Sequence, residues 1–505
     1  MKTIQYPYLF ETFDDSFLLI NMVGEHIFLS PDDFECLISE NYDKLTERAK
    51  IGLYSHHFIS SADNKDLVEN LLAVKLRSRK DFLRYFTTLH MVVLTLRCNC
   101  HCDYCHASSK NLVSKETDMS LETAKHVLDV ILQSPSSEVK IEFQGGEPSL
   151  NWTVLEFFVL EGEKKVKEGL KKSIYFVICT NLINLSDEQI EFCKNHHVEI
   201  SSSCDGPKFF YDLHRHALDG SSAYEHFIKI LQKVRKIKGD NSVNALLTIT
   251  KDNLHHLPEV IDHYMKLGFR NVFLRALNPY GYAKQNEAQL GYSLEEFVQI
   301  YRDALEYIFT INQNGTFFAE SYAALIFERI MTPFSTGFVD LQSPTGAGIA
   351  GAIYYYNGDV YPSDEGRMLA AMGDCHFRMG NVYYDDFKTI FSSKVMKDLV
   401  QNSCVESMLG CSTCAYSPYC GADPIRYYTE SGDLMGKRYD SGFCRRNKGA
   451  IKVILDIIKE NDPKKIAILW SWVQRRPLEG LAMWQTRGIG TNITKPIIAR
   501  FSKKK

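Results

Sequence analysis

Apolar positions recur with two different periods along residues 90–313, and the period changes from one segment to the next. Short β-branched runs predict buried strands, whereas apolar residues spaced three or four apart predict helices. The predicted strands are residues 90–97, 138–144, 173–180, 198–204, 241–250 and 269–277. The predicted helices are residues 119–134, 151–171, 186–196, 222–238, 255–267 and 293–313.

This alternation of strands and helices predicts an α/β fold with a parallel sheet. Six strand-helix units in a row indicate a full or partial (β/α)6 barrel of the TIM type. In such a barrel the reactive side chains lie at the carboxyl ends of the strands, so the segments that directly follow each predicted strand are the first places to look for chemistry.

The first 85 residues follow another pattern. Residues 17–30 predict two strands around a turn at Val23-Gly24-Glu25. Ser30 is then expected to cap a helix, with Pro31 at its first position and Asp33 placed for a capping box. A second helix near residues 42–54 completes a small β-hairpin and helix module.

The composition changes this picture little. The 505 residues, 45% hydrophobic and 24% charged, predict a globular protein of two or three domains. Acidic residues soon follow the first methionine, and no apolar run approaches the length of a membrane span, so we expect a cytoplasmic protein. In that compartment the 14 cysteines are metal ligands or reduced core residues more often than disulfides.

Charge is distributed unevenly along the chain. Residues 462–505 hold ten basic and two acidic residues, and the net charge of −4 therefore leaves −12 for the rest. A basic tail on a mildly acidic body argues against an enzyme of nucleic acids. We expect neither a nucleic acid nor a membrane among the partners, and no function is assigned to the tail.

Three cysteines follow the first predicted strand in the order Cys98-x3-Cys102-x2-Cys105. This spacing lets one short loop hold one corner of a [4Fe–4S] cluster and leaves the fourth iron open. Structural zinc is the alternative, but it prefers paired Cys-x2-Cys motifs that supply four ligands. The spacing favours iron and sulfur, and Cys100 lies outside the pattern.

Polar residues follow three further strands of the predicted barrel. Gly145 and Gly146 permit close backbone approach to a ligand, and Glu147 offers a carboxylate to an ammonium group. Asn181 ends the third strand, and Ser203 lies on the fourth, in Ser-x-Asp-Gly. Arg215 lies downstream. For Ser203 and Arg215, a structural turn residue and a surface salt bridge remain equal alternatives.

A second group of cysteines lies near the C-terminus. Cys411-x2-Cys414-x5-Cys420 is followed by Cys444, which gives four thiols. Four cysteines can hold a closed iron-sulfur cluster, and they suit zinc equally well.

The first cysteine loop, with Tyr104 before its last cysteine, resembles the signature of the radical S-adenosylmethionine (SAM) enzymes. The resemblance implies a [4Fe–4S] cluster on Cys98, Cys102 and Cys105 that binds SAM and yields a 5′-deoxyadenosyl radical. It further implies SAM contacts from these residues: Tyr104, Gly145, Gly146, Glu147, Asn181, Ser203 and Arg215. Glu147 would meet the amino group, Asn181 the ribose end and Arg215 the carboxylate.

Residues 321–450 resemble the SPASM extension of radical SAM enzymes that modify peptides and proteins. That extension usually holds two auxiliary clusters. The ligands of one are replaced here by Thr345, Ser363 and Pro424, so the resemblance implies one auxiliary [4Fe–4S] cluster, on Cys411, Cys414, Cys420 and Cys444. Two clusters would bring about eight irons per chain. Cys375 and Cys404 could substitute as cluster ligands, but we expect them to be buried thiols. Asp364 matches a proposed acid-base residue of some relatives.

The most similar family is the radical SAM maturase of the His-Xaa-Ser repeat system (the HxsB type). The resemblance is carried by residues 28–31, 141–148, 340–344, 364–369 and 419–424. It implies as partners a peptide or protein with His-Xaa-Ser repeats, a second radical SAM protein and an electron donor. The first module resembles winged-helix domains that hold leader peptides, although a cap that only packs on the barrel is equally compatible with its pattern.

The predicted domains are residues 1–85, 86–320 and 321–450, followed by a helix and basic tail over residues 451–505. The predicted function is therefore a peptide-modifying radical SAM enzyme. Two rivals remain: a radical SAM enzyme that acts on a small molecule, and a scaffold without activity that holds zinc at both cysteine groups.

Overall fold

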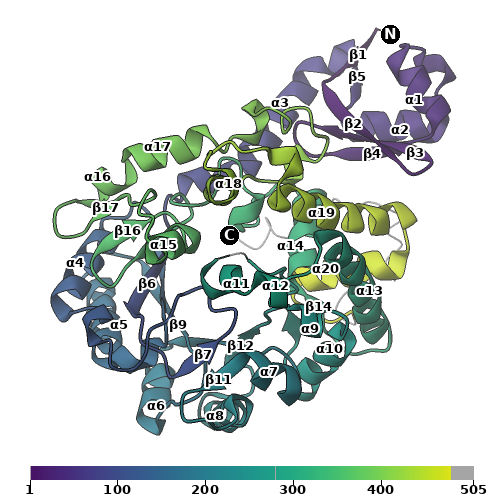
Figure 1. The fold of residues 1–505 in the computed structure, drawn as a ribbon. Helices are drawn as coiled ribbons and strands as arrows, with labels where there is room; N and C mark the ends of the chain where they lie inside the picture. The colour runs from purple at the N-terminus through teal and green to yellow at the C-terminus, as the bar shows by residue number, and fades with distance from the viewer. Residues whose placement is uncertain (1, 279, 479–505) are drawn as a thin grey trace.

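The computed structural model describes residues 2–278 and 280–478. The N-terminal elements stand apart from the rest, at the upper right of Figure 1. An antiparallel sheet contains, in this order, β2 (Tyr8–Phe13), β3 (Ser16–Asn21) and β4 (His26–Leu29). The other elements of this part are β1 (Thr3–Gln5), which pairs with β5 (Ile59–Ser61), and the helices α1 (Pro31–Ile38), α2 (Glu47–Ser55) and α3 (Lys65–Arg79).

The predicted elements of this part are confirmed. The two predicted strands are β3 and β4, and the turn between them contains Gly24 at a φ of +76°. Ser30 caps α1, because its Oγ accepts a hydrogen bond from Asp33 N (3.2 Å). The predicted capping box does not form, because the Asp33 carboxylate accepts from the Ser30 hydroxyl (3.1 Å) and from Thr46 N (2.8 Å) and not from the Ser30 backbone. The second helix, α2, begins after Thr46, whose hydroxyl accepts from Ala49 N (3.2 Å).

A parallel sheet forms the centre of the molecule. Its strands are, in spatial order, β12 (Val243–Leu246), β10 (Glu199–Ser203), β9 (Ser173–Cys179), β8 (Glu138–Gly145) and β6 (Leu89–Thr95). These are the first five predicted strands. Their apolar side chains, among them Val92, Ile141 and Ile200, are buried in the main core. Parallel pairing brings the carboxyl ends of all five strands to one edge.

The six helices predicted between and after the strands are also confirmed. They are α4 (Leu121–Leu132), α5 (Trp152–Lys167), α6 (Asp187–Asn195), α8 (Ala223–Lys238), α10 (Leu257–Lys266) and α13 (Leu294–Gln313). In Figure 1 helices α4, α5, α6, α8 and α10 lie around the outside of the curved sheet. Their apolar faces therefore cover one side of the sheet and leave its other side to the loops.

The sixth predicted strand, residues 269–277, does not join the central sheet. Only β13 (Asn271–Val272) is extended there, and it pairs with β14 (Ala319–Glu320). Beyond it, Leu274 N donates to the Glu320 carboxylate (2.9 Å) and Arg275 N to the Phe273 carbonyl (3.1 Å). Because these backbone groups are bonded elsewhere, this segment cannot continue the ladder.

The C-terminal part extends the same sheet from its other side. Strand β15 (Gly351–Tyr354) runs parallel to β6, with Gly351 opposite Leu89. The antiparallel strands β16 (Asp359–Tyr361) and β17 (Gly380–Asn381) complete an eight-stranded sheet. The sequence pattern did not predict this continuation.

The remaining longer helices belong to the second half of the chain. They are α14 (Ser321–Met331), α15 (Asp364–Ala371), α17 (Lys394–Gln401), α18 (Pro424–Ser431), α19 (Gly442–Glu460) and α20 (Pro463–Gln474). The helix predicted from residue 451 begins earlier, because Ser441 caps it through Cys444 N (3.1 Å). Trp484 and the three terminal lysines of the predicted tail lie outside the described residues. No helix in the described ranges is long and apolar enough to cross a membrane.

The N-terminal part is attached to the body at the end of α3. The buried guanidinium of Arg79 donates to three backbone carbonyls, those of Val23, Arg329 (3.1 Å) and Pro418 (3.1 Å). The Tyr419 hydroxyl donates to the Gly24 carbonyl (2.9 Å). One arginine thus ties the β3–β4 turn to α14 and to the segment just before Cys420.

Candidate functional site

The first cysteine loop lies at the carboxyl end of β6. It contains the short strand β7 (Cys100–Cys102), which pairs with β11 (Arg215–Ala217) so that Cys102 lies opposite Arg215. A backbone hydrogen bond from Tyr282 to Cys105 (2.9 Å) holds the other end of the loop. Cys98 is buried, and Cys102 and Cys105 are half-buried, so the three thiols predicted to bind iron lie in one largely enclosed loop.

Burial and neighbouring charges give the three thiols different tendencies to ionise. Burial raises the pKa of Cys98 and of Cys105, and the negative charge of Cys102 adds to both shifts. The pKa of Cys102 itself is lowered, because the Cys100 thiol 3.7 Å away donates to it and the Arg215 guanidinium lies near. Cys102 is therefore the first of the three to become a thiolate.

All 14 cysteines are free thiols. Within residues 2–278 and 280–478, no group of three or more histidine, cysteine or carboxylate side chains is arranged to hold a metal ion. The donor set fits an iron-sulfur cluster in its chemistry, although not yet in its geometry, since one loop carries three unpaired thiols that influence one another's pKa. Thiolates are the ligands that such clusters require.

The Gly-Gly-Glu segment follows β8 and packs against the end of β6. A Cβ on Gly146 would lie 2.3 Å from the Arg97 carbonyl oxygen, and Gly145 has a φ of +145°. The two glycines therefore let this segment pack closely against the backbone that follows β6. This contact requires glycine whether or not a ligand binds. Glu147 is buried, and its two oxygens accept from Ser149 N (3.0 Å) and Asn181 N (2.8 Å).

Asn181 lies directly beside the cysteine loop. Its side-chain nitrogen is 3.7 Å from Cys98 Sγ and donates to Asn99 Oδ1 (2.7 Å). Its side-chain oxygen accepts from Ile183 N (2.9 Å). Because its backbone N–H also donates to Glu147, three of the predicted site residues, Cys98, Glu147 and Asn181, form one connected group at the ends of β6, β8 and β9.

Arg215 is buried, which excludes the alternative of a surface salt bridge. Its Nε donates to Asp205 Oδ2 (2.7 Å), and its guanidinium lies over the rings of Tyr104 (5.3 Å) and Tyr211 (5.4 Å). The Tyr104 hydroxyl donates to the same Asp205 carboxylate. Tyr104 and Arg215 therefore share the Asp205 carboxylate as an acceptor beside the cysteine loop. Ser203 is the last residue of β10, two residues before Asp205.

Two further carboxylates organise this region, and the sequence pattern did not single them out. Asp118 binds Arg97 through two contacts (2.8 and 2.7 Å) and accepts from the Thr95 hydroxyl (2.5 Å). Asp205 accepts from Arg215, Tyr104 and Thr248 N (3.0 Å). The residues that bind Asp118 and Asp205 lie elsewhere in the sequence. The Ser-x-Asp-Gly turn contains Asp205 and was the one local signal, but it was interpreted as a role for Ser203.

Asp364 lies in the first turn of α15 and is already paired. Arg367, one turn further along the helix, binds it through Nε (3.1 Å) and Nη2. The third guanidinium nitrogen of Arg367 donates to the Ala107 carbonyl in the cysteine loop (3.0 Å). Asp364 is thus near the predicted cluster, but its carboxylate already forms an ion pair with Arg367.

The four C-terminal cysteines come together as a second group. Burial raises the pKa of Cys444 to about 11, and the charges of Cys414 and Cys411 add to the shift. Burial likewise raises the pKa of Cys420, and the other three thiols add to it. Each thiol therefore lies within electrostatic range of its neighbours, although Cys411 and Cys444 are separated by helix α18 in the sequence.

Three positions at which the resemblance implied lost cluster ligands have structural roles in this chain. Ser363 caps α15 through Gly366 N (3.4 Å), and Pro424 begins α18. Thr345 is buried, and its backbone N donates to Ser403 (3.0 Å). Cys375 is exposed, so the expectation that it is a buried thiol is wrong. Cys404 is half-buried and donates to the Val400 carbonyl (3.4 Å).

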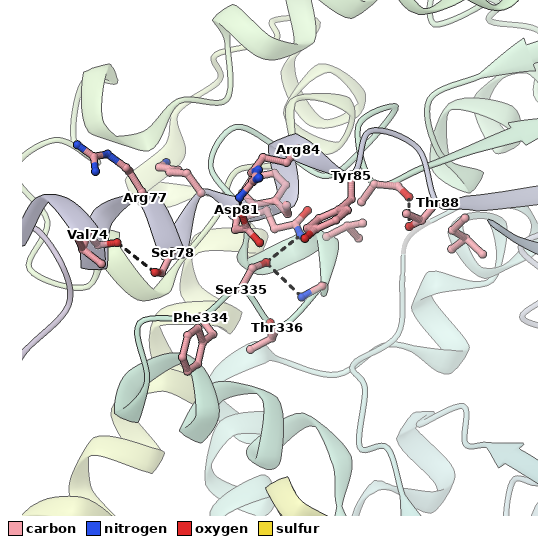
Figure 2. Close-up of a pocket in the computed structure, with 17 residues that line it drawn as sticks. Val74, Arg77, Ser78, Asp81, Arg84, Tyr85, Thr88, Phe334, Ser335 and Thr336 are labelled. Carbon is pink, nitrogen blue, oxygen red and sulfur yellow. Dashed lines mark hydrogen bonds and ion pairs between the residues drawn. The ribbon is translucent and has the colours of Figure 1, made fainter. Parts of the chain in front are cut away.

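A cavity of about 1050 Å³ lies at the other end of β6. It is enclosed by α3, by the short helix η3 (Asp81–Arg84) and by residues 334–342. Figure 2 shows Tyr85 and Asp81 on one side and Ser335 and Thr336 on the other. None of the predicted cofactor or metal residues lines it, and we assign it no part in the chemistry.

Comparison with known proteins agrees with this geometry. Residues 92–264 match the model of the radical SAM superfamily. The cysteine-type anaerobic sulfatase-maturating enzyme of Clostridium perfringens is 23% identical over 352 residues, which cover 66% of this chain and 91% of that protein.

Two solved structures share the fold. Native anSMEcpe with bound AdoMet has a TM-score of 0.59 at 17% identity and covers 74% of this chain and 100% of its own. SuiB of Streptococcus suis, bound to its precursor peptide SuiA, has a TM-score of 0.52 at 16% identity and covers 88% and 100%. These two likenesses concern the fold, and the match to the radical SAM superfamily, for which the cysteine loop and the polar residues around it have the right chemistry, covers residues 92–264.

Proposed function

We propose that this chain is a maturase that uses SAM-derived radical chemistry to modify a ribosomally made peptide or protein, of the His-Xaa-Ser type. The observation that carries the radical part is the convergence of Cys98, Cys102 and Cys105 with Glu147, Asn181 and Arg215 at one edge of the sheet. Three thiols provide one open iron, and the polar residues around them have the chemistry that an amino acid cofactor requires.

In this proposal Cys98, Cys102 and Cys105 hold the [4Fe–4S] cluster. Arg215, oriented by Asp205, would offer guanidinium N–H groups to the SAM carboxylate, and Asn181 would meet the ribose end. Glu147 would receive the ammonium group through the unused lone pairs of its buried carboxylate. The bound cofactors would supply a 5′-deoxyadenosyl radical that takes a hydrogen atom from the substrate.

The peptide substrate is supported by the relatives. One is named a sulfatase-maturating enzyme, and SuiB was solved with a precursor peptide. The HxsB type, with its His-Xaa-Ser repeat substrate, second radical SAM protein and electron donor, rests on the sequence resemblance. The sheet edges of the N-terminal module would suit an extended leader peptide, which adds a strand to such an edge.

The auxiliary site would hold one [4Fe–4S] cluster on Cys411, Cys414, Cys420 and Cys444. Four thiols that influence one another's pKa have the chemistry that a fully protein-held cluster requires. Zinc suits four thiolates equally well, so the iron content decides between them. We expect about eight irons per chain for two clusters and about four if the auxiliary site holds zinc.

The test is 5′-deoxyadenosine formation by the anaerobically reconstituted protein with SAM and a strong reductant. Cys102→Ala should abolish it and lower the iron content by about four. Cys36→Ala, which removes a half-buried thiol of the N-terminal module outside the motif, is the matched control and should keep both. Equal loss in both variants would contradict the assignment of the motif.

This measurement, combined with a peptide-binding assay, separates the rival functions. A small-molecule enzyme would cleave SAM but would show no affinity for a His-Xaa-Ser peptide. A zinc scaffold would contain no iron and would form no 5′-deoxyadenosine in any variant.

A further inference from the structure

Helix α19 contains a buried asparagine one turn after the last cysteine of the second group. Cys444 and Asn447 are three residues apart on this helix, so their side chains lie on the same face. Asn447 is fully buried, and its Nδ2 lies 3.9 Å from Cys420 Sγ. One helix face thus contributes both a thiol and an amide to the group of four cysteines.

The partners of the Asn447 side chain fix which end of its amide faces the sulfur. Arg446 Nε donates to Asn447 Oδ1 (3.2 Å). A guanidinium can only donate, so the atom that faces it must be the amide oxygen. The Tyr322 hydroxyl donates to the same oxygen (3.2 Å). The amide nitrogen must therefore point the other way, toward Cys420.

The two amide protons of Asn447 have two acceptors. Nδ2 donates to the backbone carbonyl of Asp340, on the short helix η6 (Val339–Leu341), over 3.4 Å, and to Cys420 Sγ. The Asp340 carboxylate in turn binds Arg446 (2.9 Å). An amide side chain has two donor and two acceptor positions, and here all four have a partner once the sulfur is counted. Rotation of the amide would break several of these bonds, so the N–H group stays on the sulfur.

An N–H group directed at Cys420 is poorly satisfied while that residue is an ordinary thiol. A thiol sulfur is a weak acceptor, and a buried donor without a good acceptor is costly. A thiolate that ligates a cluster carries negative charge and accepts a much stronger hydrogen bond. Side chains that bond metal ligands in this way orient the ligands and tune the metal. The geometry therefore suits a ligand sulfur better than a free thiol.

We propose that Asn447 is a positioning residue that raises the reduction potential of the auxiliary cluster through an N–H···S hydrogen bond to Cys420. On reduction the cluster gains one electron from an external reductant, and no bond forms or breaks. The added negative charge strengthens the hydrogen bond, so the bond stabilises the reduced form more than the oxidised form.

This inference rests on the auxiliary-cluster part of the proposed function. It deepens that part, because it makes the C-terminal site a redox centre whose potential is set by a side chain of α19. A closed zinc site would need no such adjustment, since zinc undergoes no redox change.

The experiment uses the full chain with Cys98, Cys102 and Cys105 replaced by alanine, so that the auxiliary cluster is the only one expected. Its midpoint potential is measured by a redox titration followed by electron paramagnetic resonance. Asn447→Leu removes the N–H donor at nearly constant side-chain volume. We expect its cluster to be about tenfold harder to reduce, which is a fall of about 59 mV for one electron.

Tyr322→Phe is the matched control, because it removes a donor from the same amide and leaves the N–H group on Cys420. Both variants lose hydrogen bonds of this buried network, so both should lower Tm. Only Asn447→Leu should lower the potential. An equal fall in both variants would assign the effect to disturbed packing and overturn the inference.

A measurement on the unsubstituted Asn447 covers the case in which Asn447→Leu fails to fold or to retain its cluster. Protein made with asparagine that carries ¹⁵N in its side-chain amide is studied by pulsed electron paramagnetic resonance of the reduced cluster. Within residues 2–278 and 280–478, Asn447 is the asparagine whose side chain donates to a sulfur of this group. We expect a ¹⁵N coupling to the cluster, and its absence overturns the inference.

The outcomes separate this inference from the proposed function. About four irons in the auxiliary site, with an unchanged potential in Asn447→Leu, overturn the inference alone. Zinc in place of iron overturns the inference together with the auxiliary cluster. The radical function is tested separately, by 5′-deoxyadenosine formation in the parent protein.

Discussion

Asp205 is the side chain on which the orientation of Arg215 depends. It accepts from Arg215 Nε (2.7 Å), Tyr104 and Thr248 N (3.0 Å), all in a buried place. Asp205→Asn would leave the guanidinium without a counter-charge, and breaking such a buried pair costs about 3–5 kcal/mol of stability. We expect a lower Tm and weaker SAM binding, measured by calorimetry.

The exposed Asp219→Asn is the control for this prediction, because that carboxylate binds Ser221 of its own loop and lies 3.9 Å from His226 at the surface, away from Arg215. Unchanged SAM affinity in Asp205→Asn, at equal Tm, would show that Arg215 does not depend on Asp205.

Asp423 should also make stability depend on pH. Its pKa is about 7 in the folded chain and about 4 when unfolded, so the folded state binds the proton more tightly. Stability is therefore highest below the unfolded pKa and is lost as the pH rises toward 7. We expect Tm of the parent to fall from pH 5 to pH 8 more steeply than Tm of Asp423→Asn. Parallel curves would contradict this prediction.

Among single residues, the sequence predicted those that belong to a short motif of neighbouring positions. The Cys98-x3-Cys102-x2-Cys105 loop and the Gly-Gly-Glu segment follow their strands directly, so their positions could be read from the chain. Asp118 and Asp205 could not be found in this way, because their meaning comes from partners up to 101 residues away. Asp364 matched a family position, but its ion pair with Arg367 became visible only in three dimensions.

Among the elements, α14 depends most on one buried carboxylate. Glu320 caps it and accepts from Tyr322 N (3.1 Å), Ala323 N (2.5 Å), Leu274 N (2.9 Å) and the Tyr301 hydroxyl (2.8 Å). Glu320→Ala leaves four donors without an acceptor, and each such group costs about 1–3 kcal/mol. We expect a loss of at least about 3 kcal/mol in urea unfolding.

Glu306→Ala is a suitable control, since its carboxylate only binds Lys465 on a partly exposed face. Equal stabilities of the two variants would contradict the role of Glu320 in joining β13, β14 and α14.

The attachment of the N-terminal module depends on α3. Replacing Arg79 by methionine keeps most of the apolar stem but removes the donors for the carbonyls of Val23, Arg329 and Pro418. We expect a loss of about 2–4 kcal/mol and faster proteolysis between the module and the body. Arg77→Met is the control: Arg77 lies two residues earlier on the exposed face of α3, and its replacement should change neither the stability nor the cleavage pattern.

Elements with a strong local period were predicted, and those defined by distant partners were not. Helix α1 and the predicted helices that follow the strands of the parallel sheet have clear apolar faces, most of them begin at a side-chain cap, and all were found. Strand β15 was missed because its short apolar stretch gains meaning only from its pairing with β6. Residues 269–277 have a strand-like composition, but Glu320 takes the backbone donor that a sheet would need.

At the scale of the whole molecule, β6 is shared by two predicted domains. It pairs with β8 on one side and with β15 of the second half on the other. A fragment of residues 86–320 would expose the backbone of β6 as a free edge next to an apolar face. We expect this fragment to aggregate in size-exclusion chromatography, whereas the fragment 86–478 stays monodisperse.

A soluble, monomeric fragment 86–320 with native circular dichroism would contradict this prediction. It would show that the strand contributed by the second half is an addition to a sheet that is already stable.

The pairing of β7 with β11 has a consequence for biosynthesis. On the ribosome, Cys98, Cys102 and Cys105 emerge long before Arg215–Ala217, the strand that pairs with their loop. The thiols of the nascent chain must therefore stay reduced while translation continues. The loop that carries them reaches its final structure only when β11 has paired with β7. If the proposed cluster is inserted after folding, its site is therefore complete only when the chain has been synthesised beyond residue 217.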